Sequence, residues 1–188
     1  MIWRLLYYKF RKLRVKMEIL DLYDNKKSKL EKILIRENGE PLDGEFKLSI
    51  HLWIMNDEGK FLIQKRSANR KANPNKWAFT GGAVDSGEES YQGAIREAKE
   101  EMGISLIPED VEFLLGFKRE HDFVDVFLAK DNTDINNVKM QEEEVSESKW
   151  VTPTELDQII NNGEFVPAIN LYYYLFKKLL EKCKGIKF

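Results

Sequence analysis

Three glutamates at helical spacing carry the strongest chemical signal in the sequence. Glu97, Glu100 and Glu101 stand at i, i+3 and i+4, so a helix projects all three carboxylates from one face. Carboxylate oxygens without a nearby His or Cys suit a hard divalent ion, and Mg²⁺ normally completes its shell with waters and substrate phosphates. Such an ion neutralises charge on a pyrophosphate and acidifies an attacking water. The spacing therefore predicts a Mg²⁺ or Mn²⁺ site at Glu97, Glu100 and Glu101, with Glu100 and Glu101 also catalytic.

The residues around these glutamates predict how the site is held. Gly82 allows the backbone to approach the ion closely and to offer its carbonyl as a further ligand. Glu88, in a loop before the helix, is placed to pair with Arg96. Gly103 is typical of the residue that ends a helix. A neighbouring apolar face, formed by Tyr91, Ala94, Ala98 and Met102, is expected to pack on a core.

The whole segment from Gly82 to Ile104 resembles the Nudix box, G-x5-E-x7-R-E-U-x-E-E-x-G-U, where U is bulky or aliphatic. Every fixed position of that pattern is matched, by Gly82, Glu88, Arg96, Glu97, Glu100, Glu101 and Gly103. The resemblance implies an α/β fold, the Nudix-type α/β/α sandwich with a mixed β-sheet. It also implies Mg²⁺-dependent hydrolysis of a phosphoanhydride in a nucleoside di- or triphosphate or a related nucleoside diphosphate derivative.

Other residues near the box are candidates for substrate contact or proton transfer. Lys65, Arg66 and Arg70 lie between a strand and the box, where cations can reach phosphate oxygens, and Arg66 is the preferred candidate. An acidic run before the last strand, Glu142 to Glu144, can supply a general base, for which we select Glu143. The candidates to stack on a base are aromatic, with a core position as the alternative; they are Trp77, Phe79 and Phe123.

Two other functions are compatible with the sequence. The stretch from His51 to Gly82 also resembles the Nudix subgroup of isopentenyl-diphosphate isomerases, which carry a catalytic Cys and a metal-binding His before the box. This chain has Gly81 and Ala83 at those positions, so hydrolysis is favoured over isomerisation. A nucleotide sensor of low activity is the third reading, and the intact box carboxylates speak against it.

The elements that position the site follow from alternation, turn residues and caps. A hairpin is predicted over 18–24 and 31–37, further strands over 46–55, 60–66, 77–84, 111–120, 123–130 and 145–151, a helix starting at Thr152, and a long amphipathic helix over 166–182. His51 alternates with apolar residues on a strand and is expected to be structural. Asp122 and Asp125 start a strand and are candidates to face the substrate.

Length and composition predict one soluble domain over residues 17–188, preceded by a basic extension over residues 1–16. Because that extension holds six cations and no acid while the net charge is −2, the remainder is acidic, which disfavours binding to nucleic acid duplexes. We expect the extension to be an added helix, a disordered arm or the product of an upstream start codon, rather than a membrane-surface contact. A single cysteine, Cys183, suits the cytoplasm. A homodimer is left open.

Overall fold

The computed structural model describes residues 18–186, so the predictions for residues 1–16 lie outside the described part of the chain. The strands are β1 (Ile19–Tyr23), β2 (Lys29–Ile35), β3 (Lys47–Met55), β4 (Phe61–Arg66), β5 (Trp77–Ala78), β6 (Thr80–Ala83), β7 (Val111–Lys118), β8 (Asp122–Lys130) and β9 (Val145–Val151). The helices are α2 (Ser90–Met102), α3 (Pro153–Asn161) and α4 (Tyr173–Lys184), with 3₁₀ turns η1 (Arg36–Asn38), η2 (Pro108–Asp110), η3 (Ile135–Asn137) and η4 (Pro167–Leu171).

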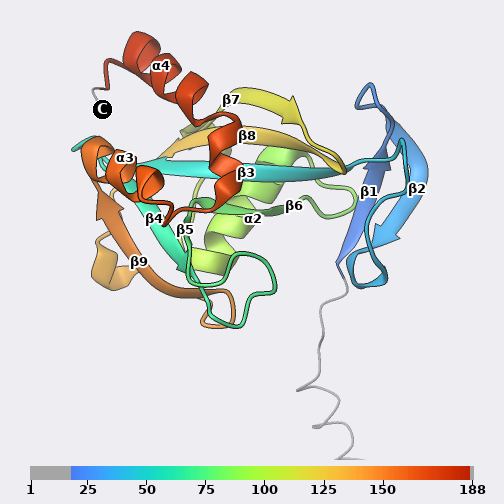
Figure 1. Ribbon diagram of the computed structural model, residues 1–188, viewed down its shortest axis with the longest axis horizontal. Coiled ribbons are helices and arrows are strands. Elements are labelled where there is room, and N and C mark those ends of the chain that lie inside the picture. The colour runs from blue at the N-terminus through green and yellow to red at the C-terminus, as the bar shows by residue number, and fades with distance from the viewer. Residues whose placement is uncertain (1–17, 187–188) are drawn as a thin grey trace, which may run out of the picture.

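Strand β3 is the centre of a mixed sheet with helices on both faces. Its alternate side chains enter two different cores, as period-two alternation requires. Leu52 and Ile54 pack with Ala98 and Met102 of α2. Trp53, on the other face, packs with the side chains of α3, η4 and α4. Figure 1 accordingly shows α2 behind β3 and η4 in front of it. The predicted mixed α/β architecture is confirmed.

The sheet divides beside β3. Strand β3 pairs in parallel with β8 along its whole length, but it meets β4 only at Ile54 and Met55. From Ser49 to Leu52, β6 takes the place of β4 as the antiparallel neighbour of β3. Strand β4 continues instead with β5 and β9. Gly82 on β6 and Gln64 on β4 therefore lie near the point where the sheet divides, facing α2.

The predicted N-terminal hairpin forms from β1 and β2 and lies at one end of β3 (Figure 1). Buried Asp21 anchors the hairpin to the loop before α2. Its carboxylate accepts hydrogen bonds from the Gly87 amide at 2.9 Å and the Ser86 hydroxyl at 2.8 Å. The Ser86 amide in turn donates to the Ile19 carbonyl at 2.7 Å. The hairpin is thus fastened directly to the loop that carries Glu88.

Three details differ from the sequence predictions. The segment 77–84 forms two short strands, β5 and β6, rather than one. The predicted C-terminal helix over 166–182 is interrupted at Tyr172, whose φ of −138° is not helical. Buried Tyr172 turns its hydroxyl inward, where Trp53 donates to it at 3.2 Å. Tyr91 of the predicted apolar face is exposed, whereas Ala94, Ala98 and Met102 are buried as expected. No helix within residues 18–186 is long and apolar enough to cross a membrane.

Candidate active site

Helix α2 is fixed at both ends by local chemistry. At its start, Glu89 and Gln92 form a capping box, in which each side chain accepts a hydrogen bond from the other residue's backbone amide. At its end, Gly103 has φ 70° and ψ 10°, the left-handed conformation that glycine adopts without strain. Both the helix and its predicted stop are confirmed. The buried alanines on one side then fix which face carries the glutamates.

Arg96 is the hub of the box. Its Nε donates to Glu88 at 3.0 Å, its Nη1 to Glu97 at 2.8 Å and to Glu100 at 3.2 Å, and its Nη2 to the Ala83 carbonyl at 2.8 Å. Burial alone lowers the pKa of an arginine, but the bonds to Glu88 and Glu97 outweigh it and raise the pKa of Arg96. The predicted pairing of Glu88 with Arg96 is present. It joins the loop, β6 and α2 into one unit.

Gly82 lies directly against the Glu97 carboxylate. A Cβ at Gly82 would overlap the carboxylate oxygens, so only glycine permits this approach. Glu97 is mostly buried, and burial raises its pKa. The attraction of Arg96 lowers the pKa of Glu97 but does not outweigh the effect of burial. This close packing is the structural basis for the glycine that begins the box.

Glu101 is the most buried of the three helix glutamates, with 4% of its surface exposed. Its Oε2 accepts hydrogen bonds from Gln64 Nε2 at 2.8 Å and from the Gly81 amide at 3.3 Å. Burial, reinforced by repulsion from Glu97, raises the pKa of Glu101 to about 8. Without an added cation, this carboxyl group therefore holds its proton at neutral pH.

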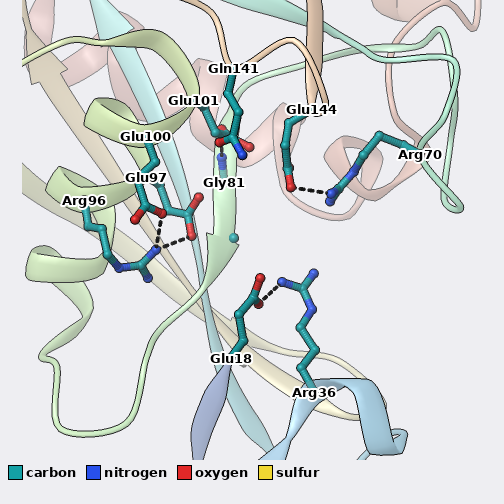
Figure 2. Close-up of a pocket in the computed structure, with 11 residues that line it drawn as sticks. Glu18, Arg36, Arg70, Gly81, Arg96, Glu97, Glu100, Glu101, Gln141 and Glu144 are labelled. Atoms are coloured by element: carbon teal, nitrogen blue, oxygen red, sulfur yellow. Dashed lines mark hydrogen bonds and ion pairs between the residues drawn. The ribbon is translucent and has the colours of Figure 1, made fainter. Parts of the chain in front are cut away.

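These glutamates line a cavity of about 320 Å³, here called the acidic pocket. It is lined by Glu18, Arg36, Arg70, Gly81, Gly82, Arg96, Glu97, Glu100, Glu101, Gln141 and Glu144. Figure 2 shows Glu97 and Glu100 on one side, Glu144 with Arg70 on the opposite side, and Glu18 with Arg36 entering from the hairpin.

The acidic run before β9 contributes a different residue from the one we selected. Glu144 lines the acidic pocket and accepts a hydrogen bond from Arg70 Nη1 at 2.6 Å. Glu142 and Glu143 are exposed and lie outside the lining residues. Glu143, the predicted general base, therefore lies outside the pocket, and Glu144 is the acid of this run that lines it, because the turn that the Glu144 amide closes on the Gln141 carbonyl at 2.8 Å leaves Glu142 and Glu143 at its exposed tip.

Of the three cations predicted to contact substrate, Arg66 and Arg70 line a pocket and Lys65 does not. Arg66 and Arg70 line a second cavity of about 280 Å³, here called the basic pocket, which shares Arg36, Arg70, Gly81 and Gly82 with the acidic pocket. Lys65 lines neither pocket. Its Nζ lies 3.6 Å from Glu147 and 5.6 Å from the centre of the Trp77 ring. Lys65 is therefore withdrawn as a substrate contact.

The aromatic candidates are core residues. Trp77 and Phe79 are 5% and 7% exposed, and the Phe79 ring stacks on Trp53 with centroids 3.7 Å apart. Phe123 packs against Phe46 at 5.2 Å. Trp77 and Phe79 thus belong to the core, and Phe123 is partly buried against it, in agreement with the core alternative.

His51, Asp122 and Asp125 each have a side-chain partner in the structure. His51 Nδ1 lies 2.8 Å from the Tyr172 hydroxyl, in agreement with a structural role, and burial followed by the nearby charge of Arg119 lowers the pKa of His51 to about 4. Asp122 reaches the basic pocket but is held by Arg119. Asp125 is buried and paired with Lys27 at 2.6 Å. Of the two aspartates, only Asp122 faces a pocket.

The donor set fits a hard divalent ion. Within residues 18–186, no three acidic, His or Cys side chains are already arranged as ligands around one point, because Arg96 bonds both Glu97 and Glu100. The acidic pocket nevertheless gathers oxygen donors whose mutual repulsion contributes to the raised pKa of Glu101. The neighbouring Gln64 Oε1 is buried without a hydrogen-bond partner among the described residues. A divalent cation would offset the repulsion, so Glu97, Glu100 and Glu101 remain the expected ligands.

Sequence reasoning missed the residues that reach the site from distant segments. Gln64 bonds Glu101 from β4, and Gln141 lines the acidic pocket from the turn before β9. Glu18 and Arg36 come from the hairpin and pair with each other. One signal was available for Gln64, since this polar residue continues an apolar run, Phe61 to Ile63, in the same strand. For Glu18 and Arg36, no pattern in the neighbouring sequence indicates that they reach the site.

Comparisons with known proteins agree with this geometry. A family model described as the NUDIX domain matches residues 45–169. An uncharacterized Nudix hydrolase of Listeria monocytogenes is 34% identical over 161 residues, covering 85% of this chain and 92% of that protein. A crystal structure of the MutT protein from Methanosarcina mazei matches with a TM-score of 0.56 and 27% identity, over 72% of this chain and 95% of that one.

A further solved structure and a further protein sequence are similar to this chain. The structure of DR0079 from Deinococcus radiodurans matches with a TM-score of 0.66 and 23% identity, over 79% of this chain and 92% of that one, and shows the shared fold. An isopentenyl-diphosphate Delta-isomerase of Cereibacter sphaeroides is 31% identical over 135 residues, covering 66% of this chain and 75% of that protein.

Proposed function

The chain belongs to the Nudix family and is a hydrolase of pyrophosphate bonds, and we propose that it cleaves a nucleoside di- or triphosphate or a related nucleoside diphosphate derivative with Mg²⁺ as its ion. Nudix hydrolases generally act on nucleoside diphosphate derivatives and use divalent metal ions. The observation that carries the proposal is the acidic pocket, which Glu97, Glu100 and Glu101 line together with Gly82. The lone cysteine agrees with a cytoplasmic location.

The box residues of the acidic pocket would bind the ion or hold its ligands in position. Glu97, Glu100, Glu101 and the Gly82 carbonyl would hold the ion, which when bound neutralises the diphosphate and acidifies water. Arg96 keeps Glu97 and Glu100 in position through its hydrogen bonds.

On the opposite side of the pocket, Glu144 is placed to accept the proton of the attacking water, and Arg70 orients its carboxylate at 2.6 Å. Arg66 and Arg70 would donate to phosphate oxygens, since planar guanidinium groups match phosphate geometry.

A hydrolysis panel tests the proposal. Nucleoside di- and triphosphates, dinucleoside polyphosphates, nucleotide sugars and dinucleotide cofactors are incubated with Mg²⁺ or Mn²⁺, and products are identified by chromatography. At least one compound should release phosphate, pyrophosphate or a mononucleotide, and that release should stop with EDTA. Absence of any hydrolysis, together with tight binding of one nucleotide, would instead identify a sensor.

Isomerisation is the second candidate, because of the identity with an isomerase. That reaction needs a proton donor and acceptor, whereas this chain has Gly81 and Ala83 where the related isomerases carry Cys and His. A Cβ at Gly81 would lie 2.7 Å from the Ile50 carbonyl oxygen, so this backbone excludes a side chain there. Incubation with isopentenyl diphosphate should therefore give no dimethylallyl diphosphate, and its accumulation without hydrolysis would overturn the proposal.

A further inference from the structure

The basic pocket, next to the acidic one, is lined by more cations than carboxylates. Its ionised lining residues are the cations Arg36, Lys47, Arg66, Arg70 and Arg119 and a single carboxylate, Asp122. His51 also lines it, and its lowered pKa keeps it neutral at pH 7. Cations confined together repel one another, so the pocket attracts an anion.

Four of the five cations have a carboxylate partner, which a bound phosphate would have to share or displace; the pairs are Arg36–Glu18, Lys47–Glu40, Arg70–Glu144 and Arg119–Asp122. Arg119 is satisfied by Asp122 through two hydrogen bonds. Lys47 pairs with Glu40, which is 61% exposed, so this bond is made at the solvent side. Arg66 has no carboxylate at ion-pair distance among the side chains that the structure describes, and its Nε donates to the Ala72 carbonyl at 3.0 Å.

The shape and lining of the basic pocket disfavour a nucleobase as its occupant. The ring side chains that line it are His51 and Phe79. Phe79 is 7% exposed and stacked on Trp53, and the His51 ring packs against Phe117 and Tyr172, so neither ring presents much surface for stacking. Guanidinium and ammonium groups without a stacking surface instead match phosphate oxygens.

The hairpin sets the position of Arg36 between the two pockets. The Arg36 amide donates to the Glu18 carbonyl at 3.0 Å, and its guanidinium bonds the Glu18 carboxylate. Asp21 fastens the same hairpin to Ser86 and Gly87 of the loop before α2. Arg36 lines both pockets and so faces any chain of phosphates that passes from one to the other.

We propose that the basic pocket binds a phosphate group of the substrate beyond the anhydride that is cleaved, with Arg36 and Lys47 as its specificity-determining contacts. This inference rests on the proposed function, which places the cleaved diphosphate in the acidic pocket. The additional phosphate can come from a longer polyphosphate chain or from a separate phosphate on the retained part of the substrate. In both cases the same cations recognise it.

The direct test measures binding of inorganic pyrophosphate to the full chain in EDTA by calorimetry. Arg36 lines both pockets, whereas Lys47 lines only the basic one, so the dependence of binding on Lys47 reports on the basic pocket. Arg36→Met and Lys47→Met should each weaken binding by about tenfold, the loss expected for one charge-assisted contact. Lys32→Met is the matched control, because Lys32 is a hairpin cation paired with Glu45 that lines neither pocket. Equal loss in the control, or no binding by the wild type, overturns the proposal.

Turnover distinguishes the source of the additional phosphate. The wild type and Arg36→Met are compared on a nucleoside diphosphate, the corresponding triphosphate, and the diphosphate with a further phosphate on its ribose. The wild type should prefer one of the two more highly phosphorylated compounds in kcat/KM, and Arg36→Met should lose that preference. Equal kcat/KM on all three overturns the proposal. If none is hydrolysed while pyrophosphate binding depends on Arg36, the proposed function fails and the phosphate site stands.

Discussion

Replacing Glu101 by Gln separates the charge of this residue from its packing. The amide oxygen of a glutamine can still accept the hydrogen bonds that Gln64 and the Gly81 amide donate to Glu101 Oε2. The substitution is nearly isosteric, so the fold of α2 should persist. What disappears is the carboxyl group that we expect to lose its proton and bind the ion.

The thermodynamic consequence has a definite sign. Burial raises the pKa of Glu101 to about 8 in the folded protein, above its ordinary value of 4.5, so the folded state binds the proton more tightly than the unfolded state. This contribution to stability is complete below the unfolded pKa and is lost as pH rises through 8. Over that window the free energy of unfolding should fall by up to about 1.4 kcal/mol per pH unit, the value of one differential proton. Glu101→Gln should lack this component.

The assay combines denaturant unfolding in EDTA at several pH values with turnover at saturating Mg²⁺. Glu101→Gln should match or exceed the wild-type stability at alkaline pH, and its kcat should fall by about 10²-fold or more, as for the loss of an electrostatic catalytic element. Glu109→Gln, an exposed residue of η2, is the control. Wild-type turnover in Glu101→Gln, or an unchanged pH dependence of its stability, would refute the reasoning.

The remaining predictions concern the loop, the turn and the core. Glu88→Gln should lower melting temperature and kcat together, because Arg96 loses the bonds that join loop to helix; a change in kcat alone would contradict this. Glu144→Gln should reduce kcat at neutral pH while Glu143→Gln stays at wild type, and the reverse result would restore Glu143. The pKa of His51 is about 4, below its ordinary value of 6.5, so its contribution to stability is present above pH 6.5 and lost as pH falls toward 4. His51→Gln should show a shallower loss of stability in acid denaturation, and an identical acid profile would exclude this cause.

The parts of the site fixed by one helix were predictable from sequence, because helical geometry sets directions over a few residues. The spacing placed Glu97, Glu100 and Glu101 together and matched Glu88 with Arg96. It did not reveal that Glu101 is far more buried than Glu100. That difference arises from Gln64 on β4, which the sheet brings opposite the helix.

Predictions failed where long-range packing decides the outcome. Glu143 and Glu144 are adjacent and chemically identical, and only the turn geometry sends one of them into the pocket. The C-terminal periodicity favours one continuous helix, but the buried hydroxyl of Tyr172 holds that residue in a non-helical conformation. Arg36 reaches the site because Asp21 fastens the hairpin to Gly87, 66 residues further along the chain, which no local pattern encodes.

The most direct test is anomalous diffraction from crystals soaked with Mn²⁺ and a non-hydrolysable nucleoside diphosphate analogue. A single dominant peak, or a cluster of peaks, should lie among the carboxylates of Glu97, Glu100 and Glu101, with the diphosphate oxygens completing the shell. Peaks confined to other acidic residues, or analogue bound with no ion beside α2, would contradict a metal-assisted phosphoanhydride hydrolase built on these glutamates.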